Sequence, residues 1–403
     1  MSKVKWFKLL IILLLLSNTS YIFYTILLKD IFINTYYLFC ELIVIVAALI
    51  LLQNLERILL IRIRYEPTIF IVVSLFVLWQ LSSCYLNGMF RGSIVARILC
   101  WPMLFIAMYM LNLHENDFIY IRKIVNVSCV VLAILCIPLI YTHLFIMQRA
   151  GAVIFPTYLI LSMTPLLILV NDRKKVYKIL ILIIIFMAIT TKRSGFFVSV
   201  VNLIIYYLFD NSMNITISKR IIRLLKITIL GIFIIIFLFI ASKFINISIV
   251  ERILEMKEDG GSGRDGIWAS VLTSYKDLRA YYQFIGTGYE GVSRYVMPQG
   301  KSLSAHNDFL EVLYDYGKIG VALFIIIWIK LFIYAWISRR TKFVCHILII
   351  ITSMFMLSMF SYLFIQSFVI QCYVIALGLI MRLNIERTRV ESEKKNINYC
   401  SNI

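Results

Sequence analysis

A histidine in a polar stretch of an otherwise apolar chain is the residue best suited to proton transfer. His306 lies in the segment SAHNDFLEVLYDYGKIG and is one of four histidines among 403 residues. An unperturbed imidazole titrates at about pH 6.5, so a modest change of environment tunes it for general acid–base catalysis. A solvated loop histidine is the alternative interpretation, and position alone favours neither.

Three arginines in other polar segments could hold a phosphate. Arg193 follows Lys192 in TTKRSGFF, Arg264 lies in GSGRDGIW, and Arg294 lies in EGVSRYV. A guanidinium group donates two parallel hydrogen bonds that match the oxygens of a phosphate. Together with His306 they suggest a site that holds a pyrophosphate while a base acts nearby. Lys192 and Arg193 could instead be a snorkelling pair at a helix end, but charges kept beside an apolar environment are more often functional.

Three glycines, Gly286, Gly288 and Gly291, form the pattern GxGxxG. As a dinucleotide fingerprint this pattern needs a preceding strand and a βαβ unit. The segments on either side are helical in character, so we expect these glycines to shape a loop and not to bind a nucleotide.

Three acidic residues follow the histidine at helical spacing: Asp308, Glu311 and Asp315. They could bind a cation, but we expect them to supply negative charge near a helix N-terminus and to lie on a solvated face. The chain has no HExxH pattern and no group of His, Cys and carboxylates at ligand spacing, so no metal site is expected.

The elements that position these residues are membrane-spanning helices. Of the residues, 62% are hydrophobic and 15% are charged, whereas a soluble domain has about 45–50% apolar and about 25% charged residues. The apolar residues occur in blocks long enough to cross a bilayer. We predict an all-α, polytopic integral membrane protein with about twelve spans: 8–28, 35–55, 67–86, 94–113, 124–146, 151–170, 176–191, 194–210, 222–242, 317–338, 343–362 and 365–382.

The distribution of Lys and Arg sets the predicted orientation. The spans 176–191 and 194–210 could also be one long helix, which would invert every later segment. With two separate helices, basic residues concentrate in the loops on the side of the N-terminus, as the positive-inside rule requires. This asymmetry accounts for most of the net charge of +19 without a nucleic acid partner. It places both termini in the cytoplasm and the loop 243–316 outside.

Four regions follow from this topology. Residues 1–242 form nine helices, the first of them an uncleaved N-terminal helix, and 243–316 form a large, partly helical outer loop that carries most of the candidate site residues. Residues 317–383 form the last three helices, and 384–403 form a cytoplasmic tail.

The motifs together resemble those of the O-antigen polymerase and O-antigen ligase superfamily of membrane glycosyltransferases. His306-Asn307, nine further residues, then Gly317 and Gly320 are similar to that family's H-[NSQ]-x9-G-x-x-G pattern. TKRSGFF and GSGRDGIW resemble its two arginine motifs, and the long loop after the ninth span also agrees. One departure is Phe197, because the ligase version of the first arginine motif has leucine at this position.

The resemblance implies a glycosyl transfer at the outer face of the inner membrane. The donor would be an oligosaccharide on undecaprenyl pyrophosphate, and the reaction would invert the anomeric carbon without a metal or other cofactor. His306 would be the general base, and Arg193 and Arg264 would hold the pyrophosphate. The remaining residues expected to bind substrate are Lys192, Arg294, Lys301 and Asn307.

The two branches of the family differ in the acceptor glycolipid. A polymerase transfers the growing chain to a new lipid-linked repeat unit, and a ligase transfers it to the core sugar of lipid A. Phe197 and the sequence HNDFLEVLYDYG favour the polymerase. A transporter of polysaccharide or lipid is the non-catalytic alternative, although no repeated halves are visible. A chain-length regulator, a flippase and membrane lipid are the expected partners, and the active site would face the periplasm.

Overall fold

A computed structural model gives the fold of the chain. It describes residues 2–27, 30–54, 65–141, 157–189, 193–210, 260–296, 304–361, 363–364 and 367–400, together with positions 218, 221, 222, 225 and 229.

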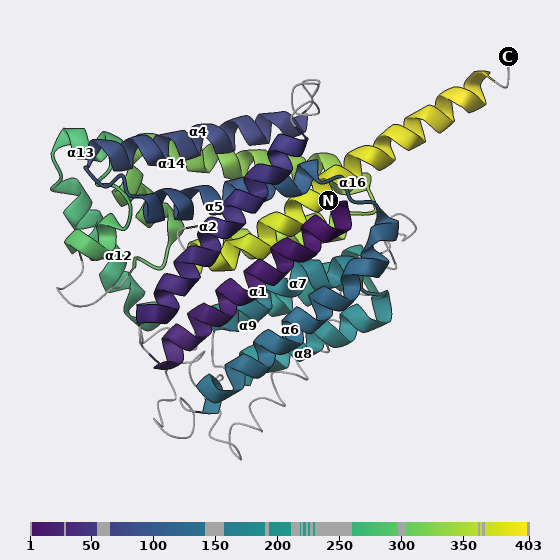
Figure 1. Ribbon diagram of the computed structural model, residues 1–403, viewed down its shortest axis with the longest axis horizontal. Helices are drawn as coiled ribbons and strands as arrows, with labels where there is room; N and C mark the ends of the chain where they lie inside the picture. Colours follow the sequence, from purple (N-terminus) through teal and green to yellow (C-terminus); the bar gives the residue numbers. More distant parts are fainter. Residues whose placement is uncertain are drawn as a thin grey trace.

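The described part of the chain is helical and contains no strand (Figure 1). The principal helices are α1 (Lys3–Leu27), α2 (Asp30–Gln53), α4 (Tyr65–Leu86), α5 (Gly92–Met110), α6 (Phe118–Tyr141), α7 (Thr157–Val170), α8 (Arg173–Ile189), α9 (Arg193–Phe209), α12 (Gly260–Lys276), α13 (Ala280–Ile285), α14 (Asp308–Ile337), α15 (Val344–Phe360) and α16 (Ser367–Cys400). Short helical turns lie at Glu115–Asp117 (η1), Val292–Val296 (η5) and Ser338–Arg340 (η6).

The helices agree with the predicted spans wherever the two can be compared. Each predicted span coincides with a helix except 222–242, which falls mainly outside the described residues. α8 and α9 are separate helices that pack against each other, so the interpretation as one long helix is wrong. The helical α12 and α13 lie within the segment predicted as a partly helical loop.

Length and hydropathy make this an all-helical, multi-pass membrane protein. Among the described residues, six helices are long and apolar enough to cross a bilayer, and four shorter apolar helices accompany them. The six are Lys3–Tyr24, Asp30–Gln53, Thr68–Leu86, Gly92–Met110, Glu115–Tyr141 and Asp308–Arg340.

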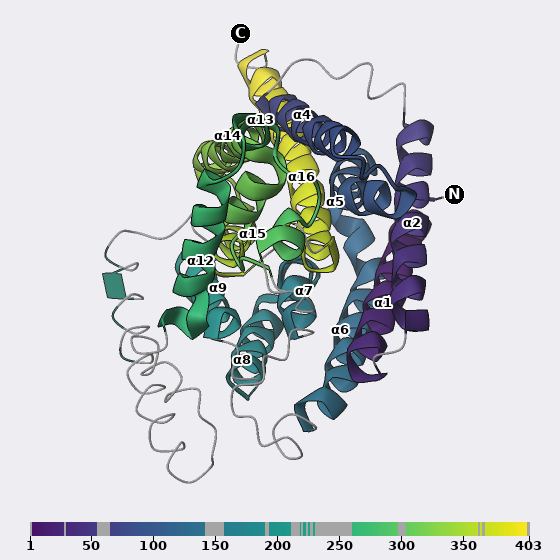
Figure 2. The same cartoon turned by 90° about the vertical axis from the view of Figure 1, so that its left-hand side faces the viewer.

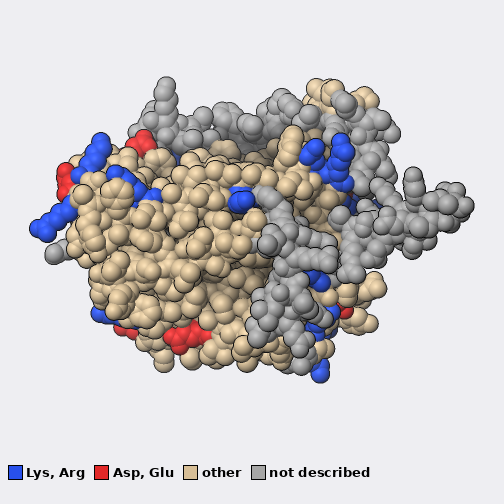
Figure 3. Space-filling model, turned by 90° about the horizontal axis from the view of Figure 1, so that it is seen from above, with Lys and Arg blue, Asp and Glu red and all other residues tan. Residues whose placement is uncertain are grey.

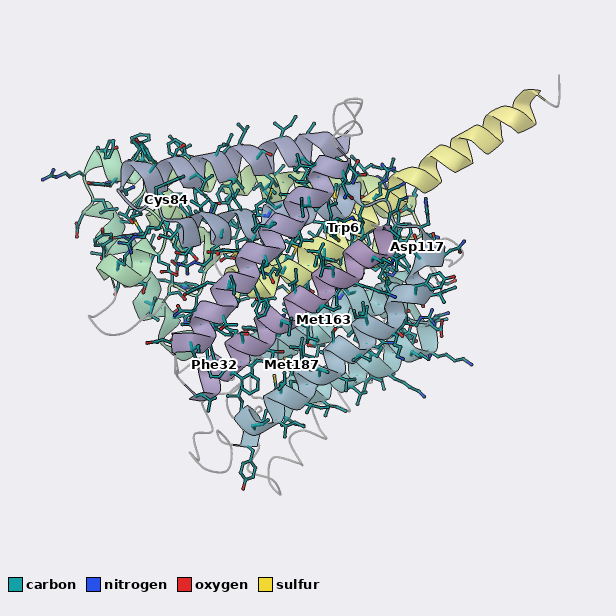
Figure 4. All side chains as sticks on the ribbon, in the orientation of Figure 1. Trp6, Phe32, Cys84, Asp117, Met163 and Met187 are labelled. Atoms are coloured by element: carbon teal, nitrogen blue, oxygen red, sulfur yellow. The ribbon has the colours of Figure 1, made fainter. Side chains whose placement is uncertain are left out.

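Charged residues are distributed unevenly between the ends of the bundle and its middle. Figure 1 shows α12 and α13 at the left, whereas the N-terminus and the C-terminal part of α16 lie toward the right. In Figure 4, Cys84 of α4 lies at the left end and Asp117 of η1 lies at the right. In Figure 3, most of the visible charged residues lie toward these two ends, with uncharged surface between them. This pattern is the one expected of helices that cross an apolar layer.

The helix α16 forms the centre of the bundle (Figure 2). Its residues from Val369 to Leu383 are almost all buried, as expected for a helix that is apolar on every side. A β-carbon at Gly378 would lie 2.6 Å from the carbonyl oxygen of Phe105, so glycine allows α16 to approach α5 closely. The Gln371 amide donates to the Cys100 sulfur at 3.1 Å and joins the same two helices.

Gly317 bends α14 where the chain enters its long apolar part. Its φ of 67° and ψ of −168° are not helical, and a side chain there would clash with the carbonyl of Phe284. At Gly286, a side chain would clash with the backbone of Asp315. Glycine at both positions therefore allows the segment after α13 to cross α14 at close range.

The bend leaves three carbonyl groups of α14 without helical partners, and neighbouring elements supply new ones. Thr287 N–H donates to Tyr314 O at 3.1 Å, Gly288 N–H donates to Asp315 O at 2.8 Å, and the Trp79 indole donates to Tyr316 O at 2.8 Å. Because buried carbonyls must be satisfied, these bonds fix α4, α14 and the glycine segment 286–291 to one another. The interpretation of these glycines as loop-shaping residues is confirmed.

Candidate functional site

His306 occupies an unusual backbone conformation. Its φ is +52°, in the left-handed region that residues other than glycine seldom adopt. The histidine is partly exposed, whereas its neighbours Ala305 and Asn307 are buried. Such a conformation persists only where the surroundings determine it, and it is common at functional sites. The contacts of the two neighbours show how it is held.

On the N-terminal side, Ala305 is bound at both of its backbone groups. Its N–H donates to the carboxylate of Glu311, and its carbonyl accepts a 2.8 Å hydrogen bond from the indole of Trp268. The first bond comes from α14 and the second from α12. The peptide before His306 is therefore fixed between these two helices.

On the C-terminal side, Asn307 caps α14. Its side-chain oxygen accepts from the N–H groups of Phe309 and Leu310 at 2.9 and 3.2 Å, which is the usual N-cap geometry. Its side-chain nitrogen donates to Met359 O at the end of α15, at 3.2 Å. These contacts give Asn307 a positioning role beside His306, and its predicted contact with substrate stays a prediction.

Asp308 ties the start of α14 to the segment that follows α15. Its carboxylate is fully buried and accepts a 2.7 Å hydrogen bond from the Ser358 hydroxyl. It also accepts from the N–H groups of Leu363 and Phe364, at 2.9 and 3.2 Å. Three charge-supported hydrogen-bond donors of this kind offset the cost of burying a carboxylate.

The expectation that the acidic residues after His306 form a solvated face is wrong. Asp308, Glu311 and Asp315 are between 0% and 2% exposed. Asp315 accepts from the N–H groups of Glu290 and Gly291 at 2.9 and 2.8 Å, as Asp308 and Glu311 accept from other backbone groups. Helical spacing alone does not reveal backbone donors from distant segments, and these donors make burial possible.

The position of Arg264 follows from that of Trp268, whose indole donates to the Ala305 carbonyl. Arg264 and Trp268 are four residues apart in α12, so their side chains lie on one face of the helix. With Trp268 bound beside His306, this face is turned toward the histidine. Arg264 also acts electrostatically on the hydroxyl of Tyr158, at the start of α7.

Tyr158 brings the first arginine motif into the same region. Its buried hydroxyl is hydrogen-bonded to the hydroxyl of Ser194, the residue after Arg193, and to Ser361 after α15. Arg193 is the first residue of α9 and is partly exposed. A helix N-terminus favours an anion, so its backbone dipole and the guanidinium act in the same sense.

The segment 358–364 connects the two halves of this cluster. Ser358 and Met359 bind the residues after His306, and Ser361 binds Tyr158 beside the arginine motifs. The residues next to Arg193 and His306, together with Arg264, therefore belong to one set of contacts built from α7, α9, α12, α14 and α15. Two cations near an imidazole can hold a pyrophosphate and accept a proton from an approaching hydroxyl.

The other predicted site residues are not part of this set of contacts among the described residues. Arg294 lies with the glycine segment, where its guanidinium donates to Tyr289 O at 2.6 Å. Lys192 and Lys301 lie outside the described residues.

Comparison with known protein families matches one part of the chain. Residues 178–325 match a family model described as O-antigen ligase. This match supports the resemblance of the chain to the O-antigen polymerase and O-antigen ligase superfamily. The match includes Arg193, Arg264, His306 and the bend at Gly317, and it confirms the resemblance of the motifs. No curated protein matches the chain.

Three residues that build the cluster have no signal of their own in the sequence. Tyr158 and Ser361 lie in apolar stretches outside the matched segment, and Trp268 reads as the apolar face of an amphipathic helix. The spacing of four residues between Arg264 and Trp268 is the one clue that could have linked the indole to the site.

Proposed function

We propose that the chain is a membrane glycosyltransferase that moves a glycan from a lipid pyrophosphate to the hydroxyl of an acceptor glycolipid. The observation that carries the proposal is the connection of three motifs, far apart in sequence, through Tyr158, Trp268 and segment 358–364. The family match to residues 178–325 supports the same class of enzyme.

In the proposed reaction, the His306 imidazole accepts the proton of the acceptor hydroxyl. The hydroxyl oxygen then bonds to the anomeric carbon, and the bond between that carbon and the pyrophosphate oxygen breaks. The electron pair of the broken bond leaves with the pyrophosphate, whose added charge Arg193 and Arg264 stabilise. Attack opposite the leaving group inverts the anomeric carbon. Lys192, Lys301 and Asn307 complete the proposed substrate contacts.

The donor proposed here is undecaprenyl pyrophosphate carrying an oligosaccharide, at the periplasmic face of the inner membrane. Basic residues toward the N-terminal side of the membrane support this orientation, with both termini in the cytoplasm. A flippase that supplies the lipid-linked donor and a regulator of chain length are the proposed partners.

Polymerase is the proposed branch, and ligase is the second candidate because the family model carries that description. The departure at Phe197 separates them weakly, since its side chain is 39% exposed on α9.

A gene-deletion strain complemented with wild type or His306→Ala tests both the activity and its branch. We expect His306→Ala to be expressed and inactive, because the variant lacks the proposed base. A lipopolysaccharide core with a single repeat unit supports the polymerase, and a bare core with polymer on undecaprenyl pyrophosphate supports the ligase. His114→Ala is the matched control, since this exposed histidine lies beside η1 at the opposite end. Wild-type glycan from His306→Ala would reject the base.

A further inference from the structure

A second group of arginines lines a cavity beside the glycine segment. The cavity has a volume of about 290 Å³ and lies where α4 ends and α5 begins. Its polar lining consists of Arg91, Ser93, Arg97, Glu290 and Arg294. Arg294 is thus associated with Arg91 and Arg97 of α5 and its N-cap.

Arg97 is the buried member of this group. Its side chain is 17% exposed and pairs with the Glu290 carboxylate at 3.0 Å. The guanidinium lies over the rings of Tyr289 and Tyr37, with centroids at 4.6 and 5.0 Å. Its Nε is buried and has no hydrogen-bond partner among the described residues. The group is therefore held in place with donor capacity unused.

The balance of charge in the cavity favours an anion. Three guanidinium groups face one carboxylate, so the lining is net positive. α5 starts at Gly92 without a side-chain cap, which leaves the positive end of a 19-residue helix directed at the same place. Burial raises the pKa of the Tyr289 hydroxyl, and this ring adds no negative charge.

The surroundings of the cavity are those of a membrane surface. Both α4 and α5 are long enough to cross a bilayer, and the cavity lies at their shared end. Beside it, Tyr85, Leu86 and Phe90 are 70%, 53% and 56% exposed. Exposed aromatic and aliphatic side chains next to cations suit a phosphate that is attached to a lipid.

We propose that this cavity binds a phosphate group carried by a membrane-anchored glycolipid, the acceptor of the transfer reaction. The identity of the acceptor rests on the proposed function. The cavity would hold the acceptor by its phosphate while Arg193 and Arg264 hold the donor. Two separate groups of arginines in one protein would then bind the phosphates of the donor lipid and of the acceptor lipid.

Lipid binding by full-length protein in phosphatidylcholine nanodiscs tests the site, with a polyprenyl phosphate as the probe. The background variant is Arg193→Gln with Arg264→Gln, so that the donor site does not contribute. In this background we expect Arg91→Gln and Arg97→Gln each to weaken binding about ten-fold or more, because each loses charge-assisted hydrogen bonds to phosphate. Arg91 is exposed, so its variant does not depend on the packing of Arg97. Arg279→Gln, an exposed arginine before α13, should bind as the background does.

Three results would overturn the proposal. Unchanged affinity in both Arg91→Gln and Arg97→Gln would reject the site, and equal weakening by Arg279→Gln would indicate general charge attraction. Equal competition by phosphatidylglycerol would assign the cavity to bulk lipid headgroups instead of an acceptor. Binding is measured without turnover, so an active His306→Ala would refute the proposed base and leave this result standing.

Discussion

At the residue scale, the histidine and the arginines depend on neighbours for their position. The backbone of His306 has a positive φ, and Trp268 and Glu311 hold the preceding peptide while Asn307 caps the following helix. The position of the candidate base therefore depends on the residues that hold the backbone on either side of it. Arg193 is the first residue of α9, and we expect its contribution to depend on the shape of its side chain.

We expect Arg193→Lys to lower the rate of glycan transfer about 10- to 100-fold. Lysine keeps the charge but cannot donate two parallel hydrogen bonds, and a hydrogen bond to a charged group contributes about 1.5–3 kcal/mol. Transfer rates with purified protein and saturating donor measure the effect. Arg340→Lys, an exposed arginine at the other end of the bundle, should keep the wild-type rate. A fully active Arg193→Lys would show that charge alone is required.

At the scale of the elements, the bend in α14 connects the site to the bundle. His306 lies two residues before this helix, which crosses the apolar layer after Gly317. The carbonyls freed by the bend are bound by α4 and by the glycine segment. The GxGxxG pattern, which resembles a nucleotide-binding fingerprint, thus stabilises the bend in α14.

We expect Gly317→Ala to destabilise the protein by at least about 1–3 kcal/mol, because a residue with a side chain is strained at positive φ. The clash with the Phe284 carbonyl adds to this cost. Thermal unfolding in detergent measures the change. Gly266→Ala is the matched control, since a β-carbon there meets no atom within 4 Å and alanine suits the interior of α12. Equal melting temperatures for the two variants would mean that the bend needs no glycine.

At the scale of the whole molecule, charge and topology place the candidate site and the termini at opposite ends. α12 and α13 lie at one end, and the N-terminus and the last part of α16 lie toward the other (Figure 1), as does Asp117 of η1 (Figure 4). Uncharged surface lies between them (Figure 3). A single orientation in the membrane then exposes the site to one compartment.

Cysteine labelling in intact cells tests that orientation. In a Cys400→Ser background, we expect Arg279→Cys to react with a membrane-impermeant maleimide from outside. Arg340→Cys should react only after the membrane is permeabilised. Both arginines are exposed and lie in opposite end regions. The reverse labelling pattern would place the site in the cytoplasm and reject a periplasmic reaction.

The sequence predicted those features that depend on local composition. Apolar runs predicted the helices, and the types of His306, Arg193 and Arg264 indicated a candidate site that stays a prediction, because charge and proton transfer are properties of single side chains. Burial of Asp308 and Asp315 was not predictable, since their donors come from segments distant in the chain. Tyr158 was missed for a related reason: a tyrosine in an apolar run looks like ordinary core until its hydroxyl is placed beside Ser194 and Ser361.

The bend at Gly317 also limits how a bulky substrate can reach the site. Moving the glycine segment away from α14 would remove both Thr287 donors from the Tyr314 carbonyl, and an unpaired carbonyl in an apolar surrounding costs several kcal/mol. The corner formed by α4, α13 and α14 therefore cannot serve as a hinge or gate. We expect the lipid-linked donor of the proposed reaction to enter along another side of the bundle, while this corner keeps its shape.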